Sequence, residues 1–452
     1  MEQYESLPFY GRGEKIINTR VILRVRKSAL PVLLIIQVLA WIGCTPAPAT
    51  LETLPTPLAP TVLDTAIPTQ LPETPTLTAT PFVPKAVIKI VSHSPLSGNQ
   101  GIFGTDMMRG AQFAVQQLSG PLGELGYQIE LVPYDDRNNL ETALANTVGI
   151  VADPDILCSV GHLSSRITVQ TSEMYHQAGL ALLAPSTTST VLTDRQYLEI
   201  NRLIGRIDQQ GIAGAQFAKA QGFTSVFIIT EKDAYGLKNA ENFRLEADRI
   251  GIQVLGMLIP DVNDSLDSVV SRMMTANPEL VYYAGTADQA ILFFKEARAA
   301  GYTGAFFGLD DLNNPPLMDL ADPSLVKDGM YFTILTAPAN FYPDAANFIK
   351  NFEVHYNSSP LLFAARAYDA TGMCIKAIEV ASKAKGGEIP TRAEVVNAIR
   401  ALKDYKGITG TYSFNDQGDL TLATYYVYKV VSVDAANWDQ NSIIASYDIA
   451  PP

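Results

Sequence analysis

Residues 156–184 read ILCSVGHLSSRITVQTSEMYHQAGLALLA, and this stretch decides the class of fold. Two short apolar runs, Ile156–Val160 and Leu180–Ala184, have the length of buried strands, and Arg166–Ala178 between them has the composition of a helix. The same alternation of strand and helix continues on both sides of this stretch. It predicts an α/β fold, in which parallel sheets are covered on both faces by helices.

The alternation covers most of the chain after the first eighty residues. The other expected strands are Val87–Ser92, Tyr127–Pro133, Val226–Thr230, Ile252–Ile259, Val281–Gly285 and Ala305–Gly308. The other expected helices are Leu140–Val151, Ile212–Ala220, Leu237–Arg249, Leu266–Thr275, Gln289–Ala299 and a first helix that runs from an N-cap at Thr105 to Leu118. Longer helices are expected at Asp344–His355, Phe363–Lys383 and Arg392–Leu402, followed by a hairpin or edge strands at Gly410–Phe414 and Thr424–Val433.

The strand–helix units fall into two sets, which indicates two Rossmann-like lobes. One set ends near Ile204, and a second set of similar length ends near Leu335. Two lobes of parallel sheet place the loops that follow their strands toward a shared cleft. Such a cleft is a common position for a ligand site.

The composition excludes several classes of function. The chain has 452 residues, 47% of them hydrophobic, and a formal net charge of −13. Residues 1–84 hold equal numbers of acidic and basic side chains, so the acidic excess lies in residues 85–452. An acidic domain lacks the basic surface of a nucleic-acid binder. Anionic lipid would repel it, so attachment to a membrane needs a separate anchor.

The N-terminal region has the pattern of a signal peptide. A basic stretch, residues 20–27, precedes the mostly apolar run Ala29–Gly43, which is short for a membrane span. The residues Ile42-Gly43-Cys44 resemble a bacterial lipoprotein processing site, with Cys44 as the lipidated residue, although Trp41 stands where Leu or Val is usual. An uncleaved N-terminal anchor is the alternative. Both place the lobes outside the cytoplasmic membrane.

A spacer separates this region from the lobes. Residues 45–84 contain ten Pro and eleven Thr. Because proline fixes φ and removes a hydrogen-bond donor, this composition is typical of an extended linker.

The other cysteines and the histidines do not show the pattern of a metal site. We interpret Cys158, in an expected strand, and Cys374, on an expected apolar helix, as small core residues, with a mutual disulfide as the less favoured alternative. The histidines at positions 93, 162, 176 and 355 lack ligand spacing. The loop Pro95–Gly104 is rich in glycine but is not G-x-G-x-x-G, so a dinucleotide is not expected. We therefore expect neither a metal nor a cofactor.

Two loops carry groups that suit an anion. Gly161–Arg166 and Ala184–Thr190 follow neighbouring strands and supply hydroxyls and backbone N–H groups just before helices. Several neutral donors at the positive end of helix dipoles are what a carboxylate needs. Ordinary helix N-caps are the alternative for either loop alone. The occurrence of both on neighbouring strands favours an anion pocket.

The expected second lobe offers an acid. Asp310 follows the strand that ends at Gly308, a position from which a carboxylate can pair with a ligand ammonium. A solvated acidic turn is the alternative. Phe103 and Tyr235 are candidates for apolar walls of the site, or for packing against their neighbours.

A set of short motifs occurs in a consistent order along residues 86–430. The motifs are Tyr134-Asp-Asp136, Gly161-His-Leu-Ser-Ser165, Ala184-Pro-Ser-Thr-Thr188, Tyr235-Gly236, Val281-Tyr-Tyr283, Gly308-Leu-Asp310 and Phe414-Asn-Asp-Gln-Gly418. Together they resemble one family, the leucine/isoleucine/valine-binding proteins of bacterial ABC importers, which have the type I periplasmic-binding fold.

The resemblance implies roles for individual residues. The α-carboxylate of an amino acid would be held by Ser165, Ser186 and Thr188, and its α-ammonium by Asp310. Phe103 and Tyr235 would be aromatic contacts, and Thr286 falls where the family has a tyrosine on the ammonium side.

Two further departures from the family concern the acid and a disulfide. Asp310 stands where the branched-chain binders carry the longer Glu. Asn138 and Ser164 stand where the family has a disulfide in its first lobe. The resemblance therefore supports an amino acid as the class of ligand more firmly than it supports leucine in particular.

The family fold also implies that the chain crosses between the lobes near residues 205, 335 and 408. The expected organisation is a signal peptide (1–44), a linker (45–84), an N-terminal lobe (85–205 and 336–407) and a C-terminal lobe (206–335 and 408–452).

These features predict a solute-binding lipoprotein of an ABC importer. It would be a monomer, lipid-anchored outside the cytoplasmic membrane, that binds an amino acid or a similar small zwitterion and is recognised by ABC permease subunits. A sensory binding module for an amide, a urea-like compound or an aromatic carboxylate is the alternative. An enzyme is not expected, because His162 and the serines at 164 and 165 lack a nucleophile elbow.

Overall fold

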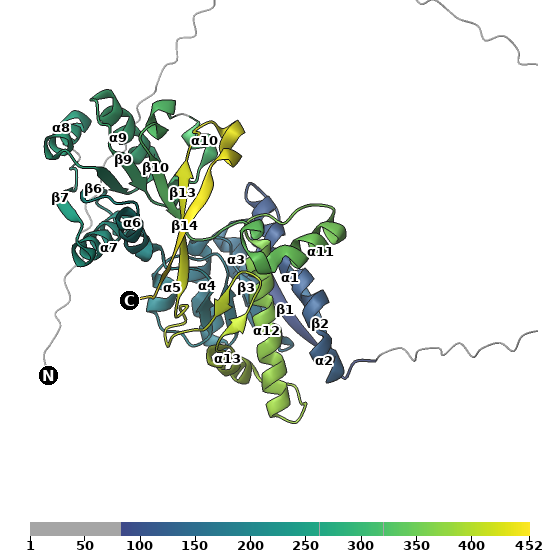
Figure 1. Ribbon diagram of the computed structural model, residues 1–452. Coiled ribbons are helices and arrows are strands. Elements are labelled where there is room, and N and C mark those ends of the chain that lie inside the picture. The colour runs from purple at the N-terminus through teal and green to yellow at the C-terminus, as the bar shows by residue number, and fades with distance from the viewer. Residues whose placement is uncertain (1–82, 262, 320) are drawn as a thin grey trace, which may run out of the picture. The chain divides into compact units, whose positions relative to one another are not determined.

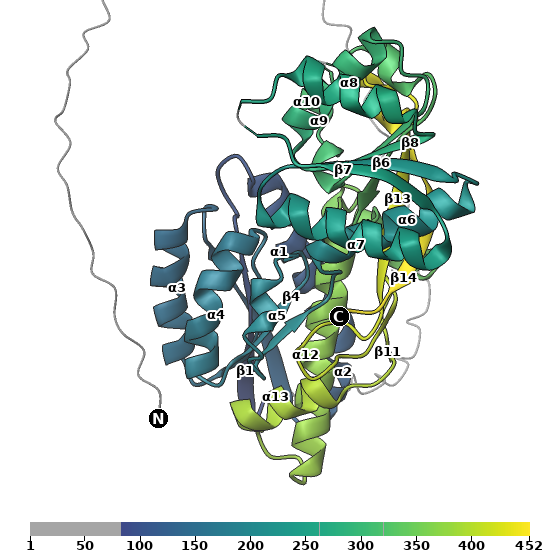
Figure 2. The ribbon, with the colours of Figure 1, turned by 90° about the vertical axis from the view of Figure 1, so that its left-hand side faces the viewer.

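The computed structural model describes residues 83–261, 263–319 and 321–452. The expected signal peptide, Cys44 and the linker up to residue 82 lie outside the described residues. In the described part, the strands form two large sheets and one short two-stranded ribbon, and helices lie on both faces of each large sheet (Figure 1, Figure 2). The α/β class predicted from the sequence is confirmed.

The first sheet is parallel, with the order β2-β1-β3-β4-β5. Its strands are β1 (Ala86–Ser94), β2 (Tyr127–Asp135), β3 (Ile156–Gly161), β4 (Ala181–Ala184) and β5 (Ile200–Arg202). The helices between them are α1 (Gly101–Leu118), α2 (Gly120–Glu124), α3 (Leu140–Ala152), α4 (Ser165–Gln177) and α5 (Val191–Asp194). Apolar side chains of α3 and α4 pack on one face, and α1 covers the other together with two later helices, α12 (Ala364–Ala384) and α13 (Arg392–Ala401).

The second sheet is mixed, with the order β14-β13-β10-β9-β8-β6-β7. Its parallel strands are β6 (Ser225–Thr230), β7 (Gln253–Leu258), β8 (Leu280–Ala284), β9 (Ala305–Gly308) and β10 (Met330–Ile334), and its antiparallel strands are β13 (Ala423–Val430) and β14 (Ser442–Ile449). α6 (Gln210–Ala220) and α7 (Ala234–Ile250) pack on one face, and α8 (Leu266–Ala276) and α9 (Ala287–Ala299) pack on the other. The short α10 (Pro315–Met318) follows β9.

Three connecting segments join the elements of one sheet to those of the other. Residues 203–209 lead from β5 to α6, residues 335–345 lead from β10 to α11 (Ala346–Tyr356) and on to α12, and residues 402–422 lead from α13 to β13. The last segment contains the ribbon β11 (Tyr405–Lys406) and β12 (Thr411–Tyr412). α12 runs alongside the first sheet in Figure 1, where it packs against α1 and α13.

The first helix begins earlier than predicted. α1 starts at Gly101 with Gln100 at its N-cap, so the N-cap predicted at Thr105 is wrong. A Cβ atom at Gly104 would lie 1.9 Å from the carbonyl oxygen of Pro95. This glycine therefore allows the helix to pack closely on the preceding loop. Because glycine is also common in turns and loops, the sequence around Gly104 resembled a loop.

The two predicted C-terminal runs do not form a hairpin with each other, and the second run is not an edge strand. Only Thr411–Tyr412 of the first predicted run forms a strand, and it pairs with Tyr405–Lys406. The second run corresponds to β13, whose neighbours are β10 and β14. β14 was not predicted, because its sequence is only weakly apolar. The strand lies at the sheet edge, and most of its side chains are exposed or half-buried. The short β5 and the buried β10 were also missed. The other expected strands and helices are present, β9 with the predicted bounds and the rest with one or both ends shifted.

Cys158 and Cys374 form a disulfide, which corrects the interpretation that they are unpaired. Both are buried, as expected for core residues. Cys158 lies in β3 and Cys374 in α12, two elements that pack together although the cysteines are 216 residues apart in the chain. Sequence spacing contains no signal for such a pair.

Among the residues that the structure describes, no helix combines the length and the apolar character that crossing a membrane requires.

Candidate functional site

A cleft of about 970 Å³ is lined by side chains from both sheets and from the connecting segment 203–209. Ser165 and Thr188 come from the loops after β3 and β4, Tyr235 comes from the first turn of α7, and Asp310 comes from the loop after β9. Because the carboxyl ends of parallel strands meet at one edge of a sheet, loops that are far apart in the chain converge here.

Ser165 and Thr188 lie against one another on the first-sheet side. Thr188 N donates a hydrogen bond of 3.3 Å to Ser165 Oγ, so the hydroxyl proton of Ser165 remains available for an acceptor in the cleft. Ser165 is also the first residue of α4, whose N-cap residue Ser164 makes no side-chain capping bond. The positive end of this helix therefore adds to the donors on this side of the cleft.

Ser186 and Phe103 are not among the residues that line the cleft. Ser186 Oγ donates to the backbone oxygen of His162 at 2.7 Å and so ties the loops after β3 and β4 together. Phe103 lies in α1 and packs edge-on against Phe363, with 6.0 Å between the ring centroids. Their roles as direct ligand contacts stay predictions.

Asp310 is the candidate ligand-binding acid on the second-sheet side of the cleft. Its Oδ1 accepts hydrogen bonds of 2.7 Å from Tyr235 OH and from Gln210 Nε2. Among the described residues, no ion pair includes Asp310 and no hydrogen bond falls on its Oδ2. Burial raises the pKa of Asp310, and the same burial with the nearby carboxylate raises the pKa of Tyr235. Asp310 is half-buried, and a partly desolvated carboxylate without a cationic partner attracts a cation from the ligand.

Thr286 lines the cleft, but its polar groups already have a partner. Thr286 N and Thr286 Oγ1 both donate to Glu231 Oε1, at 2.7 and 2.8 Å. The hydroxyl therefore supports the N-terminus of α9 through Glu231. Its predicted contact with a ligand stays a prediction.

A buried cluster supports the loop that carries Ser165. His162 Nδ1 lies 2.8 Å from Asp136 Oδ2, and His162 Nε2 lies 3.0 Å from Thr171 Oγ1. The ring of His93 lies 4.1 Å from that of His162. Burial lowers the pKa of both histidines, so both are neutral near pH 7. Sequence spacing did not reveal this cluster, because its members come from three different strand ends.

Donor atoms of His93, Asp136 and His162 lie within 4.8 Å of one another, close enough to raise the question of a metal ion. Each ring nitrogen already has a polar partner: those of His93 lie 3.3 Å from Tyr175 OH and from Asn146 Nδ2. A metal ion would have to displace these contacts, so we interpret the group as a hydrogen-bonded core cluster.

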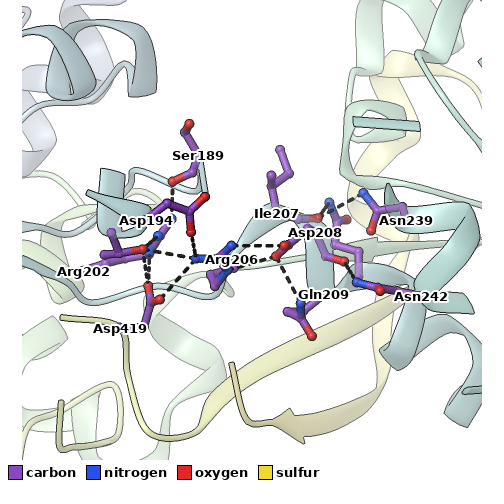
Figure 3. A network of polar contacts seen from close by, with 12 residues as sticks. Ser189, Asp194, Arg202, Arg206, Ile207, Asp208, Gln209, Asn239, Asn242 and Asp419 are labelled. Carbon is purple, nitrogen blue, oxygen red and sulfur yellow. Dashed lines mark hydrogen bonds and ion pairs between the residues drawn. The ribbon is translucent and has the colours of Figure 1, made fainter. Parts of the chain in front are cut away.

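Sequence reasoning also missed an ion cluster that contributes Asp194, Arg206 and Asp208 to the lining of the cleft (Figure 3). Arg206 binds both oxygens of Asp208 at 3.1 Å, and its second terminal nitrogen reaches Asp194 at 2.8 Å and Asp419 at 3.3 Å. Arg202 Nε donates to the other oxygen of Asp419 at 2.8 Å. Burial alone would lower the pKa of Arg206, but the bonds to Asp208 and Asp194 outweigh it and raise the pKa. The cluster joins connecting segments 203–209 and 402–422.

Beside this ion cluster, the site thus combines the neutral donors of Ser165 and Thr188 on one side with the carboxylate of Asp310 on the other. The arrangement suits a small molecule that carries an anionic group and a cationic group. His162, the base that a hydrolase would need, is buried and hydrogen-bonded at both ring nitrogens. It does not line the cleft.

Residues 87–436 match the sequence model of a family described as "Periplasmic binding protein". The chain belongs to this family. The predicted relationship to the leucine/isoleucine/valine-binding proteins is confirmed. The family consists of solute-binding proteins rather than enzymes, and it acts outside the cytoplasmic membrane.

Individual relatives agree with this membership. This periplasmic binding protein is 28% identical, over 76% of its length and 89% of the relative, to a leucine-, isoleucine-, valine-, threonine- and alanine-binding protein of Pseudomonas aeruginosa. Among solved structures, it resembles an ABC transporter substrate-binding protein of Desulfitobacterium hafniense in complex with Leu (TM-score 0.62, 21% identity, 79% of this chain and 100% of that one). It also resembles a solute-binding protein of R. palustris in complex with benzoate (TM-score 0.56, 19% identity, 81% and 98%). These structures support the type I fold.

Proposed function

We propose that this periplasmic binding protein captures an amino acid, or a similarly small zwitterion, in its cleft and presents it to the permease subunits of an ABC importer. One observation carries the proposal: Asp310 lines the cleft as a half-buried carboxylate, and both hydrogen bonds that its side chain accepts fall on Oδ1. Oδ2 is then the acceptor for a ligand ammonium. The amino-acid-binding relatives support the same class of ligand.

The opposite end of the ligand would bind the first-sheet side. Ser165 Oγ, the backbone N–H groups at the start of α4 and the Thr188 hydroxyl would donate to its α-carboxylate. A ligand that touches both sides makes more contacts when the sides approach. It would therefore shift an equilibrium between open and closed forms of two lobes, 85–205 with 336–407 and 206–335 with 408–452.

Lipid attachment at Cys44 and the Pro/Thr-rich linker would hold this domain at the outer face of the cytoplasmic membrane. The disulfide between Cys158 and Cys374 agrees with an oxidising compartment of this kind. The mature protein would be a monomer that works without a cofactor and catalyses no reaction.

The test is a thermal-shift and calorimetric screen of amino acids, amides and aromatic carboxylates against the purified protein. We expect zwitterionic amino acids to raise the melting temperature through preferential binding to the folded state. Asp310→Asn should weaken that binding at least about 30-fold, because it removes the partner of a desolvated ammonium. Asp404→Asn is the matched control, because Asp404 is an exposed acid that does not line the cleft, and binding should not change in this variant.

The alternative is an aromatic carboxylate or an amide, bound for transport or for a sensory partner. The structural likeness to the benzoate complex favours keeping it in the screen. Stabilisation by benzoate that persists in Asp310→Asn, with no effect of amino acids, would replace the zwitterion. Genes for a permease beside the gene for this protein would favour transport over sensing.

A further inference from the structure

Gln210 holds Asp310 through two separate bonds. Gln210 is the first residue of α6 and is fully buried. Its Nε2 donates to Asp310 Oδ1 at 2.7 Å, and its Oε1 accepts from Asp310 N at 3.1 Å. The amide of one residue therefore holds both the side chain and the backbone of the acid that the proposed function assigns to the ligand ammonium.

The orientation of this amide follows from its other partners. Gln210 Nε2 also donates to the backbone oxygen of Ile207 at 3.3 Å, and Gln210 Oε1 accepts from Thr333 Oγ1 at 2.6 Å. A backbone N–H only donates and a backbone oxygen only accepts, so Asp310 N and Ile207 O together fix which end of the amide is oxygen. The NH₂ group must face the Asp310 carboxylate.

This orientation favours the ionised form of Asp310, because a donated hydrogen bond is stronger to a carboxylate than to a neutral carboxylic acid. An NH₂ group cannot accept a proton from a carboxylic acid, whereas the hydroxyl of Tyr235 can rotate and accept one. Gln210 is therefore the group that opposes a proton on Oδ1. We propose that Gln210 is a positioning residue, which keeps Asp310 ionised and leaves Oδ2 as the atom that receives the ammonium group of the ligand. The proposal rests on the function proposed above.

The other groups that act on Asp310 do not replace this contribution. Asp311, its neighbour in the chain, disfavours the ionised form of Asp310. Tyr235 from α7 donates to the same oxygen as Gln210, and the buried Tyr282 from β8 is an uncharged neighbour. No lysine or arginine of the described residues pairs with Asp310. Burial raises the pKa of Asp310 while the bonds from Tyr235 and Gln210 lower it, so loss of Gln210 must raise it further.

The direct test needs no ligand. The side-chain carboxyl of Asp310 is titrated by ¹³C NMR in the wild-type protein and in Gln210→Met, with the signal assigned by comparison with Asp310→Asn. We expect the midpoint in Gln210→Met to lie about one to two pH units higher, because one hydrogen bond to a charged group is lost. An unchanged midpoint overturns the proposal.

Gln216→Met is the matched control. Gln216 lies on the same helix, and its Nε2 donates to the Glu246 carboxylate at 2.9 Å, away from the cleft. The Asp310 midpoint should not change in this variant. If Gln210→Met does not fold, Gln210→Glu keeps the shape of the side chain. Two carboxylates in contact cannot both ionise, so we expect a strongly raised titration midpoint for the carboxyl pair in Gln210→Glu. A midpoint that is not raised in this variant would overturn the proposal.

A second measurement connects the charge state to binding. The affinity for L-leucine is measured by calorimetry between pH 5 and 8. As the pH is lowered, the affinity of Gln210→Met for L-leucine should begin to decline at a higher pH than the affinity of the wild type. A purely structural defect would lower the affinity equally at every pH. If the wild-type protein binds neither L-leucine nor any other zwitterion, the proposed function is wrong. The NMR titration still decides the role of Gln210 in that case.

Discussion

Arg366 and Asp369 lie one turn apart on α12, and between them they bind all three segments that connect the two sheets. Arg366 donates to Leu203 O at 2.5 Å and to Thr336 Oγ1 at 3.4 Å, in the first and second segments. Asp369 accepts from the backbone N–H groups of Ile408 and Thr409, both at 2.8 Å, in the third. One face of one helix thus fixes the paths along which the chain passes between the sheets.

Asp369→Asn should destabilise the protein measurably. Asp369 is buried, and its two oxygens accept bonds from both backbone N–H groups. An amide retains one acceptor atom, so a buried N–H loses its partner at a cost of about 2 kcal/mol. Urea unfolding measures the change. Asp404→Asn, an exposed position in the same connecting segment, should stay within about 0.5 kcal/mol of the wild type. Equal effects of the two substitutions would contradict the role of Asp369.

Arg206→Lys should lose most of the ion cluster beside the cleft. A lysine has one charged nitrogen, so it cannot bind both oxygens of Asp208 and also reach Asp194 and Asp419. Asp208 is buried, so the loss of its two-bond contact should lower the free energy of unfolding by about 3 kcal/mol.

Arg244→Lys provides the comparison for Arg206→Lys. Arg244 pairs with Glu241 and Asp248 on the surface of α7, where an ion pair contributes little, so the change should be below about 0.5 kcal/mol. Chemical denaturation of both variants gives the two values. A change in the free energy of unfolding below about 0.5 kcal/mol for Arg206→Lys would show that the ion cluster does not stabilise the fold.

The disulfide should be a major source of stability. It joins β3 to α12 across 216 residues, and replacing both cysteines by alanine should lower the free energy of unfolding by about 2–5 kcal/mol. Adding a reductant during unfolding should bring the wild-type transition to that of the double variant and leave the double variant unchanged. Coincident transitions of oxidised wild type and double variant would contradict this prediction.

Acid should destabilise the protein in part through His93. Burial lowers the pKa of His93 below its value in the unfolded chain, so the unfolded state takes up the proton first. The contribution of neutral His93 is complete above about pH 6.5 and is lost as the pH falls below it, by about 1.4 kcal/mol per unit. Between pH 7.5 and 5.0, the wild type should therefore lose about 2 kcal/mol more than His93→Gln.

Urea unfolding at these two pH values measures the difference. Asp136, whose pKa burial raises, has the opposite pH dependence and is present in both proteins. Equal losses in the two proteins would show that His93 does not contribute.

Part of the cleft was predictable because its geometry follows from a local rule. Ser165 and Thr188 come directly after buried strands, and Asp310 follows a strand of the second sheet. Loops at the carboxyl ends of parallel strands converge whatever their separation in the chain. Gln210 offered no such signal, since it begins a helix after a connecting segment and resembles any polar residue at a helix start.

The sequence by itself determined the α/β class, the family and the loops that line the cleft, because strand length, helix periodicity and short motifs are properties of neighbouring residues. Only the tertiary structure decided which distant side chains meet. Cys158 joins Cys374, Arg202 pairs with Asp419 217 residues away, and Gln210 binds Asp310 100 residues away. Each of these pairs unites segments that the chain brings together by passing between two sheets, and that path is set by the packing of whole elements.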